Sequence, residues 1–144
     1  MRTSFALAGL ASLLIAASAQ AQDSKPQVMV DAMPKPADCS FTKAMVCKAD
    51  AACEEAKAVG DIPLPARVLV HYQKKVIAAT SSEGIPHVSS IDSLATSGDN
   101  LTLQGVDGGA GWVLQTSRTE DGATFTAVTH ESVLLSFGTC KTLE

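Results

Sequence analysis

Apolar and polar residues alternate with a period of two in three segments of the C-terminal half of the chain. The alternation runs through residues 101–104, 124–127 and 132–137, where Leu, Phe, Ala or Val positions are separated mainly by Thr, Gln or Ser. Successive side chains of a β-strand point to opposite faces, so this pattern predicts strands with one face buried. The strongest structural signal in the sequence is therefore β.

Further apolar or β-branched runs extend the prediction along the chain. Arg67 to Tyr72 and Val76 to Thr80 are separated by Gln73-Lys74-Lys75, which predicts a hairpin. The other predicted strands are Cys39 to Cys47, Pro86 to Leu94, Asn100 to Val106, Trp112 to Ser117, Ala123 to His130 and Ser132 to Phe137. Short strands divided by Gly- and Asp-containing turns are typical of an antiparallel barrel or sandwich. We predict a mainly β domain of this kind with roughly seven strands.

The segment before the strands has a different composition. Ala51 to Val59 is rich in alanine and glutamate and is followed by Gly60, which favours about two turns of helix. Together with the nearby cysteines it predicts a short helical, disulfide-bonded head at the N-terminal side of the domain. Large side chains are scarce in the chain, which contains one Trp, one Tyr and four Phe residues. We therefore expect an interior filled by small apolar residues, without an open ligand cavity.

The N-terminus has the layout of a secretory signal peptide. Arg2 supplies a positive charge, Phe5 to Ala17 is a short apolar run, and Ala19-Gln20-Ala21 is a small-x-small cleavage site. The apolar run is shorter than the roughly 20 residues that span a bilayer, so we expect cleavage and no remaining membrane span. Residues 22–38 contain three prolines and predict an extended tether, with a docked strand at Val28-Met29-Val30 as the alternative. Residues 39–144 then form a single domain in the periplasm or outside the cell.

Charge narrows the choice of partners. The chain has 11 Lys and Arg against 15 Asp and Glu residues, and removal of residues 1–21 takes away only Arg2, leaving a net charge of −5. A modest acidic balance disfavours nucleic acid and anionic membranes as partners.

Four cysteines, at positions 39, 47, 53 and 140, allow three pairings. An exported protein folds where disulfides persist. We favour Cys47–Cys53 with Cys39–Cys140, the second of which would tie the first element of the domain to the last. Cys39–Cys47 with Cys53–Cys140 is the alternative. No C-x-x-C spacing is present, which makes structural crosslinks the preferred role over redox chemistry.

The cysteine spacing, together with two other motifs, resembles a group of small exported proteins of Gram-negative bacteria. The matching features are C-x7-C-x5-C at residues 39–53, Asp121-Gly122-Ala123-Thr124-Phe125 and Ser136-Phe137-Gly138-Thr139-Cys140. The resemblance extends over Cys39 to Cys140 and implies an exported location and a disulfide pattern. It implies no activity, and the second cysteine pair that some members carry in the middle of the domain has no counterpart here.

Candidate catalytic groups find little support in the sequence. The chain has no G-x-S-x-G motif, and its adjacent carboxylates, Glu54-Glu55 and Glu120-Asp121, are predicted to face solvent. His71, His87 and His130 are the only histidines and would form a metal site only if the fold gathered them. We expect no enzyme and no cofactor.

A binding role is the function that we predict. Gly108, Gly109 and Gly111 lie beside Trp112, and a flexible loop next to a tryptophan is a candidate contact site for a protein partner. The alternative, which the sequence favours, is that Trp112 packs in the core or caps one end of a barrel. Tyr72 is a further candidate contact residue. The predicted function is thus an exported binding or inhibitory module that acts on a protein of the cell envelope, with unknown oligomeric state. The alternatives are a metal-binding protein, a structural envelope component and a substrate-binding barrel, which would require an open apolar cavity.

Overall fold

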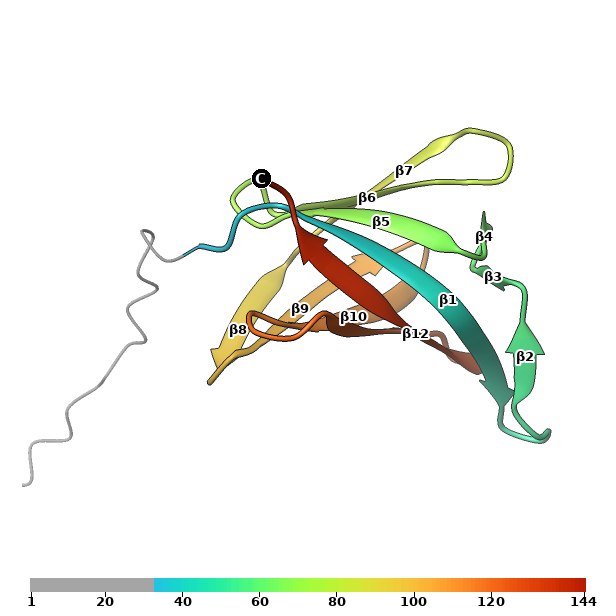
Figure 1. Cartoon of the computed structure of the whole chain (residues 1–144). Coiled ribbons are helices and arrows are strands. Elements are labelled where there is room, and N and C mark those ends of the chain that lie inside the picture. Colours follow the sequence, from blue (N-terminus) through green and yellow to red (C-terminus); the bar gives the residue numbers. More distant parts are fainter. Residues whose placement is uncertain (1–32) are drawn as a thin grey trace, which may run out of the picture.

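Residues 33–144 are described by a computed structural model, which consists of strands and connecting turns (Figure 1). The predicted signal peptide and most of the predicted tether lie outside these residues. The strands are β1 (Ala37–Lys48), β2 (Glu54–Ala56), β3 (Ala58–Val59), β4 (Ile62–Pro63), β5 (Ala66–His71), β6 (Val76–Thr80), β7 (Pro86–Ser90), β8 (Ser93–Ser97), β9 (Asn100–Asp107), β10 (Ala110–Ser117), β11 (Gly122–Val128) and β12 (Ser132–Thr142). This part of the chain forms no helix long and apolar enough to cross a membrane.

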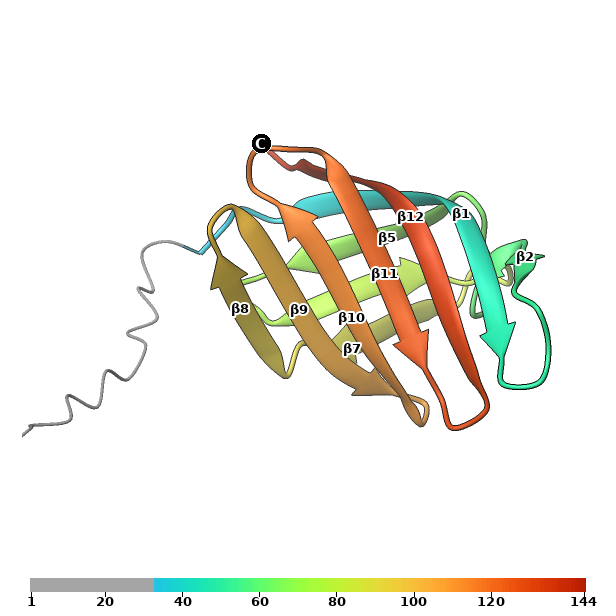
Figure 2. The same ribbon diagram turned by 90° about the horizontal axis from the view of Figure 1, so that it is seen from below.

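Ten of these strands form one antiparallel sheet. Its order is β7-β6-β5-β1-β12-β11-β10-β9-β8, with β2 paired to β1, while β3 and β4 form a separate small hairpin. The sheet curls into a half-barrel, with β5, β6 and β7 facing β9 to β11 across the interior (Figures 1 and 2). The choice between barrel and sandwich, which the sequence left open, is thus answered by a single curled sheet.

The two edges of the curled sheet belong to one nearly continuous stretch of chain. β7 pairs with β6 and β8 pairs with β9, with only Ile91 and Asp92 between them. The Ile91 amide donates to the Lys75 carbonyl on one side, and the Asp92 amide donates to the Gln104 carbonyl on the other. Two consecutive peptide groups therefore join opposite halves of the sheet.

Close packing completes this seam between β7 and β9. Gly105 of β9 lies against β10 and the β7 chain, where an added Cβ would meet the Trp112 ring at 2.5 Å and would also overlap the Ser90 carbonyl oxygen. Since real Cβ atoms do not approach other heavy atoms so closely, only glycine fits here. The absence of a side chain at Gly105 lets the two halves touch.

Size differences among the inward-facing side chains determine where the interior is filled. The largest fully buried residues, Phe41, Leu101, Leu103, Leu114 and Val70, pack in the middle of the half-barrel and toward the end where β9 begins. Toward the other end the inward positions carry smaller groups: Ala79, Ser89, Ala110 and Ala127. The core is therefore solid at one end and underfilled at the other.

Both disulfides have the pairing favoured from the sequence, which confirms that prediction. Cys39 and Cys140 lie directly opposite each other on β1 and β12, and Cys47–Cys53 closes the turn between β1 and β2. The first bridge joins residues 101 positions apart and links the two longest strands of the sheet. Since disulfides persist in oxidising environments, the two bridges indicate an oxidising compartment.

The predicted helical head is wrong. Residues 54–56 form β2, which pairs with residues 44–46 of β1, and residues 58–59 form β3. A helix of two turns is marginally stable by itself. The Cys47–Cys53 crosslink returns the chain beside β1, where an extended segment gains backbone hydrogen bonds that a helix would not. Tertiary pairing overrides the helical preference of the alanines.

The strand prediction is confirmed in type but not in number, since twelve strands replace the expected seven or so. The predicted hairpin corresponds to β5 and β6, β9, β11 and β12 lie where the period-two pattern placed them, and β10 contains the predicted strand Trp112 to Ser117. Pro86 to Leu94, expected as one strand, is divided into β7 and the start of β8. β1 begins at Ala37 and so includes the last two residues of the segment expected to be a tether.

Replacing both Cys39 and Cys140 by serine tests the long crosslink. We expect the free energy of unfolding to fall by about 4 to 5 kcal/mol, because a loop of about 100 residues is released in the unfolded chain. Chemical denaturation measures this. The matched control, Cys47→Ser with Cys53→Ser, opens a much shorter loop and should cost about 2 kcal/mol. Equal losses from the two pairs would contradict the assigned role of the long bridge.

Replacing Gly105 by alanine tests the seam. We expect a loss of about 1 to 3 kcal/mol, because the added methyl group must displace Trp112 or the β7 backbone. Gly111→Ala is the control, since a Cβ at Gly111 meets nothing within 4 Å and its φ is not in the left-handed region. Thermal unfolding of the two variants should differ clearly, and equal midpoints would show that β7 and β9 do not touch as described.

Candidate functional site

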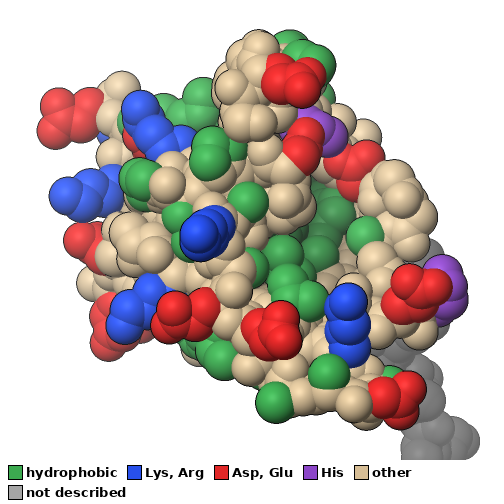
Figure 3. All heavy atoms as spheres, turned by 90° about the vertical axis from the view of Figure 1, so that its right-hand side faces the viewer, with side chains coloured by type: hydrophobic (Ala, Val, Ile, Leu, Met, Phe, Trp, Pro, Cys, Tyr) green, Lys and Arg blue, Asp and Glu red, His purple; other side chains and the backbone are tan. Residues whose placement is uncertain are grey.

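The underfilled end of the half-barrel is a cavity of about 380 Å³ that opens to solvent. This volume falls in the range typical of small-molecule sites, roughly 300 to 1,000 Å³. Figure 3 shows the hollow from the end where β2, β3 and β4 lie, with hydrophobic side chains inside it and acidic side chains around it. The expectation of a filled interior is therefore wrong for this end of the domain.

The cavity walls are mainly apolar and come from almost every part of the sheet. One wall comprises β5 and β6 with the β3–β4 hairpin, and the opposite wall comprises β10, β11 and β12. The apolar lining residues are Val46, Val59, Ile62, Val68, Ile77, Ala79, Ala110, Trp112, Phe125, Ala127 and Leu134. Such a lining favours an apolar molecule or the apolar part of an amphipathic one.

Two aromatic rings, those of Trp112 and Phe125, line the cavity, and a third ring packs against Phe125 outside the lining. Trp112 stacks on Phe125 with ring centroids 6.1 Å apart and an interplanar angle of 23°, and Phe125 contacts the buried Phe41 at 6.0 Å. Trp112 Nε1 donates a hydrogen bond of 2.9 Å to Ser89 Oγ, which satisfies the indole N–H in an otherwise apolar setting. Because Ser89 is on β7 and Trp112 on β10, this bond also connects the two halves of the sheet.

Polar groups lie at the mouth of the cavity. His87 Nε2 is 2.9 Å from Asp61 Oδ2, and the two side chains are 47% and 57% exposed. Asp107, in the β9–β10 hairpin, adds a second carboxylate to the lining, and Thr129 and Ser132 add hydroxyl groups. The lining as a whole contains two acids, one histidine and no Lys or Arg. The site is therefore apolar inside and acidic at its entrance.

These polar groups do not form a hydrolytic triad. Ser89 is two residues from His87 on β7, but its hydroxyl accepts the Trp112 hydrogen bond, and within the described chain no hydrogen bond joins it to the imidazole. A serine nucleophile requires a base within hydrogen-bond reach. The arrangement is suited to binding, with the Asp61–His87 pair at the entrance.

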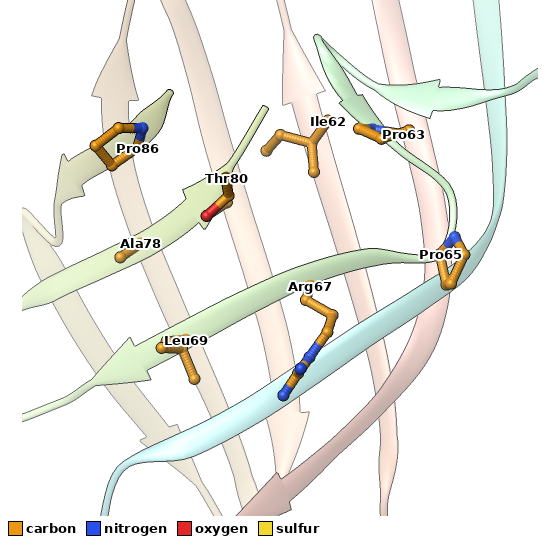
Figure 4. A pocket seen from close by; sticks show the side chains of 9 residues that line it. Ile62, Pro63, Pro65, Arg67, Leu69, Ala78, Thr80 and Pro86 are labelled. Atoms are coloured by element: carbon orange, nitrogen blue, oxygen red, sulfur yellow. The ribbon is translucent and has the colours of Figure 1, made fainter. Parts of the chain in front are cut away.

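A second depression lies on the outer surface between β4, β5 and β6. Its volume is about 430 Å³, and Figure 4 shows Pro63, Pro65 and Pro86 around it, with Leu69 and Arg67 on β5. Arg67 is paired with Asp38 of β1, and this hydrogen bond and ion pair raise the pKa of the guanidinium. No buried polar group lines this depression, and Leu69 is exposed. No aromatic residue lines it, so it is less suited to bind an apolar ligand than the inner cavity.

The histidines considered as metal ligands are far apart in the fold. His71 ends β5 and accepts a hydrogen bond from the Lys74 amide, His87 pairs with Asp61, and His130 contacts Glu131 in the β11–β12 turn. Within residues 33–144 no group of three or more His, Cys, Asp or Glu side chains is placed to hold a metal ion. The structure gives the metal-binding alternative no geometric support.

The residues proposed as a protein-contact surface do not share one. Gly108 and Gly109 form the β9–β10 turn with φ values of 55° and 83°, and Gly108 borders the cavity. Gly111 lies on the outer face, whereas Trp112 is 4% exposed and faces inward. Tyr72 is buried beside Thr116, at the end of the domain away from the cavity. Trp112 and Tyr72 therefore cannot serve as exposed anchors.

The sequence analysis missed Asp61, Ser89, Phe125 and Ala127 as site residues. Their signal was present but incomplete, because small inward-facing residues recur near the ends of several strands. Which strand ends lie together depends on long-range pairing that the residue pattern does not specify.

Comparison with known proteins adds no relative: no family model, curated protein or solved structure matches this chain. The cavity must be interpreted from its own geometry.

Tyr72 gives a test of the packed end of the domain. Burial raises the pKa of its phenol above the ordinary value near 10, and the nearby Thr116 hydroxyl partly opposes this shift. The folded state therefore favours the neutral phenol. The contribution of Tyr72 to the free energy of unfolding is complete below about pH 10 and is lost as the pH rises through the higher folded pKa. Between about pH 9 and about pH 11, the unfolding midpoint of the native protein should fall more steeply than that of Tyr72→Phe. Parallel curves would show that Tyr72 is not buried.

Proposed function

We propose that this protein is an exported, non-catalytic binding protein that holds a small apolar or amphipathic molecule in the cavity of its half-barrel. The observation that carries the proposal is the cavity itself, about 380 Å³ with a mainly apolar lining that includes two aromatic rings. Apolar surface of this kind gains free energy when a ligand displaces water from it. The predicted signal peptide and the two disulfides support a location in the periplasm or outside the cell.

We place the binding site in the cavity rather than on the loop expected from the sequence. Two of the expected contact residues, Trp112 and Tyr72, are buried at different ends of the domain. The cavity, by contrast, brings together residues from both halves of the sheet around one enclosed volume. A partner protein in the envelope then becomes a source or recipient of the bound molecule rather than the primary ligand.

The support for a non-catalytic role comes from the polar groups of the site. The imidazole–carboxylate pair of the lining, His87 with Asp61, is half exposed at the mouth, and the Ser89 hydroxyl on the same strand is engaged by Trp112. Binding requires only the enclosed apolar volume and a few polar groups at its entrance.

The chain carries its own reporter for a binding experiment, since Trp112 is its only tryptophan and lines the cavity. Decanol, an uncharged molecule with a single apolar chain, is titrated into the mature domain while tryptophan emission is recorded. We expect saturable binding with a shift in emission, because the bound chain replaces water near the indole.

Two neighbouring substitutions on β11 provide the matched test. Ala127→Phe fills the cavity and should weaken decanol binding at least tenfold, because the space for the apolar chain is occupied. Thr126→Phe places the same ring on the opposite face of the strand and should leave the affinity unchanged. Circular dichroism and thermal unfolding verify that both variants fold. Absence of binding to the native domain, or equal affinities in the two folded variants, would overturn the proposal.

A further inference from the structure

We infer that the ligand is an amphiphile with an apolar chain and a positively charged headgroup; this rests on the proposed function and specifies the polar end of the molecule. An apolar chain fits the inner part of the cavity, so the headgroup must lie at the mouth. The carboxylates of Asp61 and Asp107 lie there, on opposite sides of the entrance, in the β3–β4 hairpin and the β9–β10 hairpin. A cationic group between them would be attracted by both.

The segments around the mouth are also mainly acidic. Residues 48–61, 81–87, 107–109 and 129–132 carry seven acidic residues against two lysines. The acids are Asp50, Glu54, Glu55, Asp61, Glu83, Asp107 and Glu131, and the lysines are Lys48 and Lys57. Figure 3 shows acidic side chains on several sides of the hollow. A cleft surrounded by charge of one sign attracts ligands of the opposite sign and raises their association rate.

Two side chains near the mouth, those of Lys48 and His87, are of the basic type and so would counteract the acidic side chains. Lys48 lies opposite Ser132 in the β1–β12 pairing, at the margin of the cavity, and is exposed. The His87 imidazole is in the lining, but its Nε2 atom is directed at Asp61. An anionic headgroup would thus approach the two carboxylates of the lining, while Lys48 and Lys57 both lie outside the lining. The charges around the mouth therefore favour a cationic headgroup over an anionic one.

The test compares three probes with the same apolar chain: decyltrimethylammonium, decanol and decanoate, each below its micelle concentration. Trp112 emission reports binding at about pH 8, where the mouth carboxylates are ionised. Because the mouth carboxylates are exposed, we expect the cationic probe to bind on the order of tenfold more tightly than decanoate at low salt. The difference should shrink as salt is raised, since exposed charges are screened.

Charge-neutralising variants locate the effect. Asp61→Asn with Asp107→Asn should reduce the preference for the ammonium probe by about threefold or more and leave decanol binding unchanged. Glu120→Gln with Asp121→Asn is the control, because it changes the net charge equally in the β10–β11 turn, at the other end of the domain. The control should keep the native preference.

The outcomes separate this inference from the proposed function. If decanol binds but decanoate binds as tightly as the ammonium probe, the headgroup assignment is overturned and the cavity remains a binding site. If the two double variants behave alike, the preference does not arise at the mouth and the inference fails. If no probe binds, the proposed function fails and the headgroup assignment fails with it.

Discussion

The structure depends on how a curled sheet joins its two edges. Strands at the edge of a sheet leave backbone groups unpaired, and a full barrel removes the problem by pairing the edges. This chain instead passes from one edge to the other through Ile91 and Asp92, whose amides bond to opposite halves. The junction holds the edges together where β7 ends and β8 begins, and small side chains toward the start of β7 and the end of β9 leave the interior open there. Closure therefore comes from this connection, and the cavity comes from the small size of the inward-facing side chains at one end.

The two disulfides crosslink β1 near its two ends. Few bulky side chains are available, and the main core consists of Phe41 with leucines and valines in its middle. The Cys39–Cys140 bridge crosslinks β1 and β12 at the centre of the strand order. The strands on both sides therefore pair with a covalently joined pair of strands. The Cys47–Cys53 bridge holds β2 beside β1 near the mouth. An underfilled interior is thus supported by covalent constraint on the unfolded chain.

Local pattern accounted for much of the fold. The alternation in residues 101–104 and 124–127 was sufficient to predict β9 and β11, because each strand has one face in the core and one in solvent. The favoured cysteine pairing was also correct, since it joins the ends of the domain. The β2 segment was assigned to a helix because alanine-rich composition describes an isolated chain, whereas its conformation follows from pairing with β1.

The cavity was harder to predict from the sequence, because its position depends on which strands pair with one another. The break between β7 and β8 occurs without glycine or proline, because it arises from pairing with two different strands. Asp61 and Asp107 are 46 positions apart in the sequence, and nothing local indicates that they border one opening. Trp112 was considered a contact residue because glycines precede it, but it lies on β10 and the pleat turns its ring inward.

The position of the chain ends has a consequence for how the domain is oriented. The Leu143 amide bonds to the Pro36 carbonyl, so the first and last described residues emerge together at the side of the molecule away from β2, β3 and β4 (Figure 1). A surface, label or fusion partner attached through either end would lie on the side of the domain opposite the cavity entrance. The entrance to the hollow would then point outward, free to exchange its contents with the surrounding medium.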